Sequence, residues 1–252
     1  MPRLFEAYRA FHEQGFVPIF VEDDLDSRML LDACAEAGLR GIEYTLRRRD
    51  AHQMIPWIRE HLPELFLLVG STVDDEAIVA QQRRHYPQLL TLRELDAMEV
   101  DGYVSMMTMR RESIARYSPT RILMPCAMTS NDAFEQISAG AHFAKVVGPG
   151  LDLVRLCRAA PTFDYCPVVI TGGMNCLQIP EAVGAGAVLI GSGFDLILRD
   201  QTNLTQAKVV SRLREFVRVT AEARASKWPA MAQAIRGDRQ AWLDSLPHYH
   251  PF

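Results

Sequence analysis

Short runs of apolar residues recur along the chain, and amphipathic segments separate them. Such runs are typical of parallel strands buried on both faces, and the segments between them have the pattern of crossover helices. The pattern predicts eight strands. They are expected at residues 17–21, 41–45, 66–70, 102–106, 121–125, 142–147, 167–171 and 188–191.

The segment between the first two strands shows how the sequence marks its helices. Asp26 or Ser27 can cap the start of a helix, because their side-chain oxygens accept hydrogen bonds from free backbone N–H groups. Leu30 and Cys34 then share one face, and Gly38 can close the helix. Similar signals recur near residues 130 and 175, so strands and helices alternate as far as the last predicted strand.

This order of elements favours a (β/α)8 barrel of the α/β class. Eight strand–helix units fill about 175 residues with no linker rich in Pro, Gly or Ser, slightly fewer residues than the fold usually spans. A doubly wound open sheet is the alternative, but the first strand-to-helix turn reads EDDLD and lacks a glycine-rich dinucleotide fingerprint.

We therefore expect one domain in two parts. Residues 1–203 are predicted to form the barrel, and residues 204–252 a C-terminal helical extension packed on the same domain. The extension is expected to hold helices near 204–226, 229–236 and 238–246. Because these helices carry few strong apolar stripes, they have the pattern of an addition to the barrel.

Composition narrows the setting in which such a barrel works. The 252 residues are 48% apolar, and a net charge of −4 argues against nucleic acid as a partner. The five cysteines form no C-x-x-C pair that would indicate zinc or dithiol chemistry, and they fit a reducing cytosol. The sequence shows neither a signal peptide nor an apolar run long enough to span a membrane. A cytoplasmic location without a membrane partner is expected.

An acid inside an apolar strand is the first candidate for chemistry. In the segment GIEYTLR, Glu43 lies in the second predicted strand and Arg47 just past its end, where barrel strands face the active site. A buried carboxylate is costly unless it is paired or protonated. Glu43 is therefore interpreted either as a general acid or base or as half of an ion pair. Arg48 and Arg49 are expected to be solvated or paired on the rim.

A lysine in the sixth predicted strand is the second candidate. Lys145 ends the string AGAHFAK. An amine held inside a barrel, away from water, is more easily kept uncharged, and an uncharged amine can attack a ketone to form an imine. The alternative is a lysine at a strand end that extends its amine into solvent.

Three turns of small residues are the remaining candidates. They read TGGMN from Thr171, GSGF from Gly191 and GST up to Thr72. Loops after strands seven and eight, with bare backbone N–H groups, form the usual phosphate site of this fold, whereas ordinary tight turns are the alternative. The GST turn can bind a carboxylate or cap the next helix.

Taken in order, the strings IEYTLR, GSTV, MPCAMTSND, AGAHFAKV, ITGGMN and IGSGF resemble the family of 2-keto-3-deoxy-6-phosphogluconate and 4-hydroxy-2-oxoglutarate aldolases, which are lysine-dependent barrel enzymes. The resemblance implies that Lys145 forms a Schiff base with a 2-oxo group and that Glu43 shuttles protons. It implies that Arg47 and Thr72 hold the substrate carboxylate. The other substrate-binding residues that it implies are Thr129, Thr171, Gly172, Gly173, Gly191 and Ser192.

Some positions depart from the pattern of that family. A proline is expected after Ser105, where this chain has Met106, and residues 83–99 look inserted between the third and fourth strands. The chain also extends well past the last glycine-rich turn, beyond the single closing helix that the family pattern leads us to expect. These differences indicate a divergent member and leave the choice of substrate open.

The expected activity is that of a class I aldolase, a lyase that needs no metal or organic cofactor. It would cleave a 2-keto-3-deoxy-6-phospho sugar acid to pyruvate and glyceraldehyde 3-phosphate, or 4-hydroxy-2-oxoglutarate to pyruvate and glyoxylate. The expected partner is a small phosphorylated 2-oxo acid, and the resemblance implies a homotrimer. Two other functions stay open: a phosphate-binding barrel isomerase or epimerase in which Lys145 only provides charge, and a non-catalytic barrel that binds a sugar-acid phosphate.

Two further features are not assigned to chemistry. His248 and His250 lie without a carboxylate or thiol at coordinating spacing, so no metal site is predicted there. Cys126 lies at the end of the fifth strand, but no histidine is placed in the sequence to activate it. We expect Cys126 to be a packed thiol.

Overall fold

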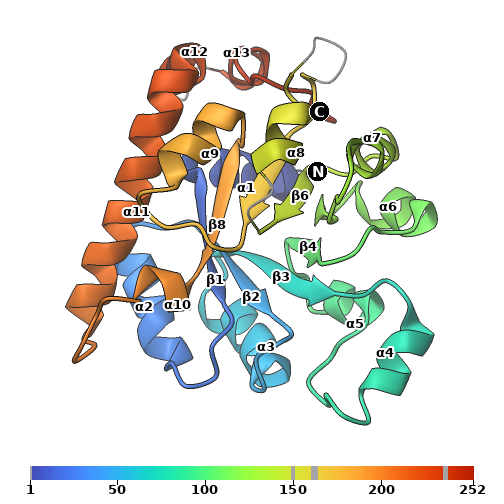
Figure 1. Ribbon diagram of the computed structural model, residues 1–252. Helices are drawn as coiled ribbons and strands as arrows, with labels where there is room; N and C mark the ends of the chain where they lie inside the picture. Colours follow the sequence, from blue (N-terminus) through green and yellow to red (C-terminus); the bar gives the residue numbers. More distant parts are fainter. Residues whose placement is uncertain (1, 149–150, 160–163, 235–237) are drawn as a thin grey trace.

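Eight parallel strands alternate with helices and curve into a barrel in the computed structural model, which describes residues 2–148, 151–159, 164–234 and 238–252 (Figure 1). The order of the strands in the sheet is β5-β4-β3-β2-β1-β8-β7-β6. The strands are β1 (Phe16–Phe20), β2 (Gly41–Thr45), β3 (Phe66–Thr72), β4 (Gly102–Ser105), β5 (Ile122–Met124), β6 (Ala144–Val147), β7 (Val168–Thr171) and β8 (Leu189–Gly193).

Strands β5 and β6 form the seam at which the barrel closes. Cys126, just after β5, pairs with Lys145 of β6 in an isolated parallel bridge. The Lys145 N–H donates to the Pro125 carbonyl at 2.8 Å, and the Ala127 N–H donates to the Lys145 carbonyl at 2.8 Å. The barrel is nearly closed, which confirms the predicted fold. Each strand begins and ends within two residues of its predicted range.

Helices cover the outside of the barrel and one of its ends. They are α1 (Pro2–Gln14), α2 (Ser27–Glu36), α3 (Ala51–His61), α4 (Glu76–Gln82), α5 (Leu92–Ala97), α6 (Arg111–Tyr117), α7 (Ser130–Ser138), α8 (Leu151–Leu156), α9 (Ile179–Ala185), α10 (Phe194–Ile197), α11 (Gln206–Lys227), α12 (Pro229–Ala234) and α13 (Arg239–Asp244). Asp26 caps α2 by accepting hydrogen bonds from the backbone N–H groups of Arg28 and Met29, as the sequence predicted. Among the described residues, none of these helices is long and apolar enough to cross a membrane.

Side chains along the strands alternate between two apolar layers. In β3, Leu67 and Val69 belong to the layer between sheet and helices, whereas Phe66 and Leu68 belong to the layer inside the barrel. This alternation follows from the period of two residues in an extended strand. It determines which residues of every strand point into the barrel.

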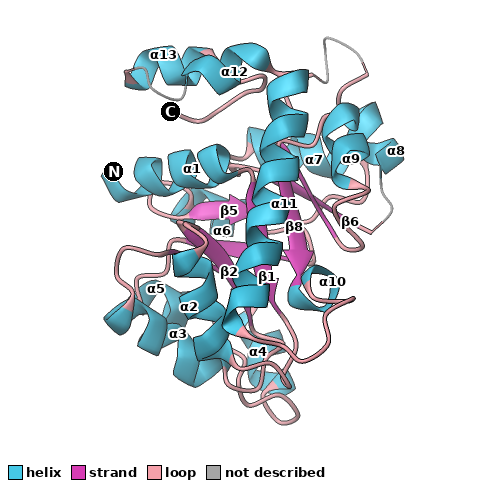
Figure 2. Ribbon diagram, turned by 90° about the vertical axis from the view of Figure 1, so that its left-hand side faces the viewer, coloured by secondary structure: helices cyan, strands magenta, loops and turns pink. Residues whose placement is uncertain are grey.

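Helix α11 takes a place in the ring of helices around the barrel. It runs along the full length of the barrel in Figure 2 and packs against α2 and α9. Leu213 and Phe216 are buried in the outer layer, and the Phe216 ring lies 5.2 Å from that of Phe16. This packing differs from the expectation of an added tail. The apolar stripe of α11 is weak because its buried face also includes Thr220 and Arg224.

The amino-terminal end of the barrel is closed by α1 together with α12, α13 and the residues that follow them (Figure 2). The Tyr8 ring stacks on Phe143 inside the barrel at 5.2 Å, and Trp242 and Phe252 pack against Tyr8 at 6.2 and 4.9 Å. A Cβ at Gly41 would collide with the Phe11 ring, so α1 approaches the start of β2 closely. Helix α1 was not predicted, although Leu4, Tyr8 and Phe11 recur at helical spacing and are buried.

Candidate active site at the carboxyl ends of the strands

Glu43 lies in the middle of β2 and points into the barrel. Only 4% of the residue is exposed, and its carboxyl group forms no hydrogen bond with the part of the chain that the structure describes. Burial raises the pKa of Glu43, and the positive charges of Lys145 and Arg47 lower it in part. Gly70 of β3 provides the room, because a Cβ there would collide with the Glu43 carboxyl group. Such a group can both hold and release a proton.

Lys145 lies in β6, on the opposite side of the barrel from β2. Its neighbours Ala144 and Val146 belong to the outer layer, so the lysine between them points inward. The residue is 3% exposed, and its Nζ lies 3.3 Å from the Sδ of Met106. The charge of Lys145 acts on Glu43 across the barrel. The barrel interior therefore brings an amine and a carboxyl group into one site.

Lys145 differs in burial from every other lysine of this chain. The sequence contains three lysines, and Lys208 and Lys227 are exposed on α11. A lysine normally extends its amine to water along an apolar stem. The burial of Lys145 rules out a strand-end lysine solvated in this way.

The three arginines after β2 have different environments. Arg47 is exposed and bonds to none of the residues that the structure describes, but its charge lowers the pKa of Glu43. Its guanidinium is therefore at the mouth of the barrel and available to a ligand. Arg49 is exposed, and its Nε lies 3.2 Å from the Oδ2 of Asp23. This is the rim pairing that the sequence predicted for Arg49.

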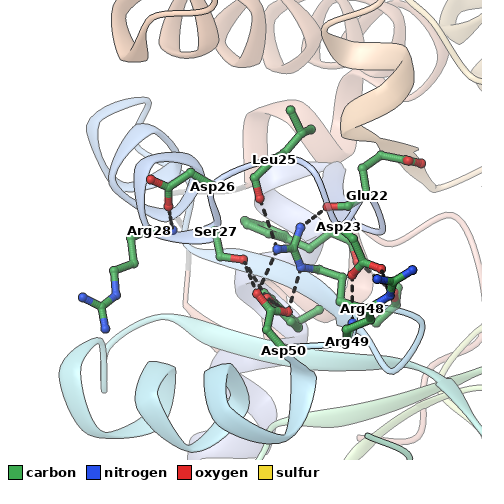
Figure 3. Close-up of polar contacts among 12 residues, drawn as sticks. Glu22, Asp23, Leu25, Asp26, Ser27, Arg28, Arg48, Arg49 and Asp50 are labelled. Carbon is green, nitrogen blue, oxygen red and sulfur yellow. Dashed lines mark hydrogen bonds and ion pairs between the residues drawn. The ribbon is translucent and has the colours of Figure 1, made fainter. Parts of the chain in front are cut away.

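Arg48 joins two loops at the mouth of the barrel (Figure 3). It donates to both carboxylate oxygens of Asp50 at 2.9 Å, to the Leu25 carbonyl at 3.1 Å and to the Glu22 carbonyl. Burial alone would raise the pKa of Asp50, but hydrogen bonds from Arg48 and Tyr44 hold it below its usual value. Arg48 is paired as expected, but it is 3% exposed rather than on the rim. The loop carbonyls accept the hydrogen bonds that water would otherwise accept from the Arg48 guanidinium.

Thr72 ends β3 beside a backbone irregularity. Ser71 has a φ of 60°, and the pairing of β3 with β4 shifts its register between Gly70 and Thr72. The Thr72 hydroxyl donates to the Val104 carbonyl at 3.1 Å, and the Ser105 hydroxyl donates to the Thr72 carbonyl at 3.0 Å. With 1% exposure, Thr72 joins two strands at the wall of the barrel. A contact with the substrate carboxylate stays a prediction.

The turn after β7 leaves backbone amides free. Gly172 and Gly173 have φ values of 83° and 78°, in the left-handed region where only glycine avoids strain. Their N–H groups donate to no acceptor among the described residues, and Gly173 is exposed. Adjacent free N–H groups form a concave site suited to an anion. Thr171, which precedes them, is 6% exposed at the end of β7.

The turn after β8 is less suited to an anion. Gly191 is enclosed by side chains of β1 and β7. Ser192 is fully buried, and its hydroxyl donates to the Met174 carbonyl at 2.6 Å, so it holds the neighbouring turn in place. The carboxylate of Asp195 lies beside Gly193 and adds negative charge at this corner.

Thr129 has its hydroxyl engaged at the start of a helix. The residue is exposed and is the N-cap of α7. Its hydroxyl accepts a hydrogen bond from the Asp132 N–H at 3.1 Å, and the Asp132 carboxylate accepts from the Thr129 N–H at 2.9 Å. This capping box satisfies two free donors of the helix. A substrate contact through Thr129 stays a prediction.

Sulfur groups next to Lys145 were not assigned a place in the site from the sequence. Met106, which contacts the amine, is 43% exposed at the mouth. Cys126 is 2% exposed, and its Sγ lies 4.0 Å from the Sδ of Met128. Burial raises the pKa of Cys126, and the charge of Lys145 lowers it in part. The signal available in the sequence was Met106, which stands where the family pattern has a proline.

No group of three or more His, Cys, Asp or Glu side chains is placed to bind a metal ion in the described parts of the chain. The polar groups that face one another in the barrel and at its mouth include one buried amine, one buried carboxyl group and the exposed Arg47. This set can bind an acid and exchange protons with it.

Neither a protein-family model nor a curated protein sequence matches this chain. Solved structures do resemble it. One described as native KDPGal has a TM-score of 0.64 at 19% identity, over 82% of this chain and 95% of that chain. The 2-keto-3-deoxy-6-phosphogluconate aldolase from Zymomonas mobilis ATCC 29191 has 0.62 at 17%, over 84% and 95%. The thiamine phosphate pyrophosphorylase from Pyrococcus furiosus has 0.60 at 15%, over 84% and 98%.

These identities establish the fold and nothing finer. The protein is a TIM barrel with C-terminal helices, and the solved structures that resemble it include enzymes. They include aldolases and a pyrophosphorylase, which perform different reactions on one architecture. The activity of this chain therefore has to be argued from its own site.

Proposed function

We propose that this protein is a class I aldolase that cleaves a 2-oxo acid to pyruvate and an aldehyde through a Schiff base on Lys145. One observation carries the proposal: the single buried lysine of the chain points into the same barrel as a buried carboxyl group. An amine excluded from water is suited to attack a carbonyl carbon. The resemblance of the fold to solved aldolases supports the same chemistry.

The reaction begins when the nitrogen of Lys145 adds to the 2-oxo carbon of the substrate. Loss of water from this adduct gives an iminium ion, which withdraws electrons from the neighbouring carbon. Removal of the proton from the C4 hydroxyl then breaks the C3–C4 bond and releases the aldehyde. The electron pair of that bond remains on the lysine-bound fragment as an enamine. Protonation at C3 and addition of water release pyruvate and restore the amine.

Glu43 is the proposed carrier of these protons. Its buried carboxyl group has a raised pKa, so it holds a proton more readily than a solvated acid does, and the nearby charges of Lys145 and Arg47 favour its release. The carboxylate accepts the proton of the C4 hydroxyl, and the acid returns a proton to the enamine carbon. A single group can serve both steps because they occur in sequence.

Arg47 is the proposed site for the substrate carboxylate. Its planar guanidinium can donate two parallel hydrogen bonds to a carboxylate. The side chain is exposed near Glu43, so a carboxylate bound there lies next to the buried pair. This contact would orient the 2-oxo group toward Lys145.

Two substrates fit this arrangement, a 2-keto-3-deoxy-6-phospho sugar acid and 4-hydroxy-2-oxoglutarate. Both carry an anion at the far end, for which the free amides of Gly172 and Gly173 are suited. The carboxylate of Asp195 beside Gly193 repels a phosphate dianion more than a carboxylate. We therefore propose 4-hydroxy-2-oxoglutarate or a close relative as the better substrate of the two.

The resemblance to the aldolase family also leads us to propose a homotrimer. Apolar side chains remain exposed on the β4–α6 and β5–α7 loops and on α7, including Met107, Met128 and Phe134. Helices α12 and α13 lie at the other end of the barrel and leave this surface open. Light scattering should give a mass near three times that of the 28.4 kDa chain, and a monomer mass would contradict the proposal.

Trapping with borohydride tests the Schiff base. The protein is incubated with pyruvate and sodium borohydride, and intact mass spectrometry should show one reduced pyruvate adduct. Trypsin does not cleave after a modified lysine, so the adduct should appear on a peptide spanning residues 122–155 rather than 122–145. Lys208→Met is the matched control and should retain the adduct.

Two outcomes would overturn the proposal. The first is the absence of an adduct on the folded wild-type protein. The second is an adduct that persists in Lys145→Met. The first outcome would favour a proton-transfer reaction at Glu43 without a covalent intermediate, because the carboxyl group would then be the only reactive group of the pair.

A further inference from the structure

A cavity of about 390 Å³ lies at the amino-terminal end of the barrel, the end opposite to the proposed active site. Four parts of the chain that are far apart in sequence meet there: α1, the loop after α6, the loop before β6, and α13 with the residues that follow it. Figure 2 shows α1 and α13 at this end of the molecule. Its apolar wall is formed by Leu4, Pro119, Pro251 and Phe252. A cavity of this size and character is suited to a small molecule.

His142 lines this cavity and has one hydrogen-bond donor to spare. The residue is 1% exposed, and its backbone N–H donates to the Leu123 carbonyl at 3.1 Å. The Leu123 N–H in turn donates to the Nδ1 of the ring at 3.2 Å, so the proton of the neutral ring is on Nε2. Nε2 forms no hydrogen bond with the described residues. A ligand that offers an acceptor would satisfy this donor.

The other polar side chains of the cavity are donors as well. Arg239 is exposed, its Cζ lies 4.2 Å from the centroid of the Phe5 ring, and it forms no ion pair with the described part of the chain. The Ser118 hydroxyl has no hydrogen-bond partner among those residues either. The described lining of the cavity includes no acidic side chain. An unpaired guanidinium beside an apolar wall therefore favours a ligand that carries a carboxylate.

We infer that this cavity binds a small aromatic acid that carries a hydroxyl or carbonyl group at the end away from its carboxylate. The guanidinium of Arg239 holds the carboxylate, and the Nε2–H of His142 donates to the second polar group. The aromatic body packs on the rings of the wall. Phe252 and His142 already contact each other there, with their centroids 5.8 Å apart and their planes tilted by 45°. Flat rings in such offset arrangements attract one another.

The ligand would hold the end of the chain against the first helix. The Phe252 ring packs on Phe5 and Tyr8 of α1, with centroid distances of 5.4 and 4.9 Å. A molecule seated between α1 and the residues after α13 contacts both segments at once, and it loses these contacts when the protein unfolds. The Tm should therefore rise with the concentration of the ligand.

Titration calorimetry with 6-hydroxy-2-naphthoate tests the site. This probe has an aromatic body, a carboxylate and a hydroxyl group at its far end, and it should bind the folded protein at one site. Two analogues separate the contacts. 2-Naphthol lacks the carboxylate and 2-naphthoate lacks the hydroxyl group, so each should bind about tenfold more weakly or less tightly still.

Two variants locate the bound probe. Arg239→Gln should weaken the binding of 6-hydroxy-2-naphthoate by about tenfold and leave that of 2-naphthol unchanged, because only the acid meets the guanidinium. Arg47→Gln makes the same charge change at the mouth of the barrel and is the matched control, which should bind the probe as wild type does. Ser118→Leu places a larger side chain in the cavity and should abolish binding.

The inference is overturned if the folded wild-type protein binds no probe at concentrations up to about 1 mM. It is also overturned if Arg47→Gln weakens binding and Arg239→Gln does not, because the probe would then occupy the mouth. Arg239 is exposed, so Arg239→Gln gives this answer even if Ser118→Leu fails to fold. Neither result depends on whether Lys145 forms a Schiff base.

Discussion

The two ends of the barrel bury ionisable groups in opposite ways. At the mouth, Glu43 and Lys145 lie on opposite sides of the barrel, and the positive charge of Lys145 lowers the pKa of Glu43 in part. At the amino-terminal end of the barrel, called the base from here on, the rings of His12 and His248 stack at 4.9 Å among aromatic side chains. Burial lowers the pKa of both, that of His248 to about 3. At the mouth, nearby positive charges thus offset part of the effect of burial on the carboxyl group, whereas at the base the nearby charges add to the effect of burial and keep the imidazoles neutral.

Hydrogen bonding separates the two regions further. At the base, Arg224 is 5% exposed and donates to the His12 carbonyl at 2.6 Å, and burial lowers the pKa of Arg224 to about 10. The Tyr8 hydroxyl and both ring nitrogens of His12 have no partner among the described residues. Packing of rings holds this region together, as between Tyr8 and Phe143. Burial of a polar group thus does not by itself mark an active site.

Replacing the amine should have the largest effect. Lys145→Met keeps the length and apolar packing of the side chain but removes the nucleophile, so pyruvate trapping should vanish and aldol cleavage should fall by about 10⁴-fold. Lys208→Met should retain full activity. Coupled detection of released pyruvate measures both. If folded Lys145→Met cleaved the substrate within tenfold of the wild-type rate, Lys145 would not be the nucleophile, and the mouth would not differ from the base in its chemistry.

The loss of the proton carrier should have the next largest effect. Glu43→Gln has nearly the same shape but cannot exchange a proton, so kcat should fall by about 10²- to 10⁴-fold. Borohydride should still capture pyruvate on Lys145, at a lower rate. A loss of stability without a loss of kcat would mean that Glu43 serves the fold only, as the histidines of the base do.

Lowering the pH should destabilise the fold through the buried histidines at the amino-terminal end of the barrel. Burial lowers the pKa of His142 to about 4 and that of His248 to about 3, against an ordinary value near 6.5. Below pH 6.5 these histidines become protonated in the unfolded chain but stay neutral in the folded chain. The free energy of unfolding should therefore fall by about 1.4 kcal/mol per pH unit for each histidine. The loss should continue down to the folded pKa.

Urea unfolding between pH 7 and pH 4.5 measures this dependence. His248→Gln should reduce the slope of the free energy of unfolding against pH by about 1.4 kcal/mol per pH unit, because it removes one group that binds a proton only in the unfolded chain. His61→Gln, which alters a histidine at the end of α3 that is not buried, is the control and should leave the profile unchanged. An unchanged slope in His248→Gln would show that this imidazole is protonated in the folded protein.

Removing a negative charge at the rim of the mouth should have the smallest effect on activity. Asp195→Asn removes negative charge beside Gly193, so kcat/KM for a phosphorylated 2-oxo acid should rise by about tenfold or less relative to 4-hydroxy-2-oxoglutarate. Asp32→Asn makes the same charge change on an exposed residue of α2 and should leave the ratio unchanged. An equal ratio in both variants would exclude Asp195 from substrate selection.

The barrel itself could be predicted because its signal is local. Strand residues alternate between two buried faces, so short, mostly apolar runs mark all eight strands, which are three to seven residues long. The same alternation places Glu43 and Lys145 inside the barrel once the strands are known. Where helix α1 packs could not be predicted, because its partners, Phe143 and Trp242, lie far away along the chain.

The two arginines after β2 show where local reasoning ends. Arg47 and Arg48 are adjacent and identical in type, yet Arg47 is exposed and Arg48 is buried under the β1–α2 loop. That loop comes more than twenty residues earlier, and its carbonyls accept the hydrogen bonds of Arg48. No pattern of neighbouring residues specifies such a contact.

The chain's own periodicity and motif spacing are enough to give the eight strands, the inward direction of Glu43 and Lys145, and the glycine-rich turns. These features depend on interactions within one strand or one turn. The packing of the folded chain settles which arginine stays free and that α11 joins the ring of helices. These features depend on contacts between distant segments, which exist only after the barrel has brought them together.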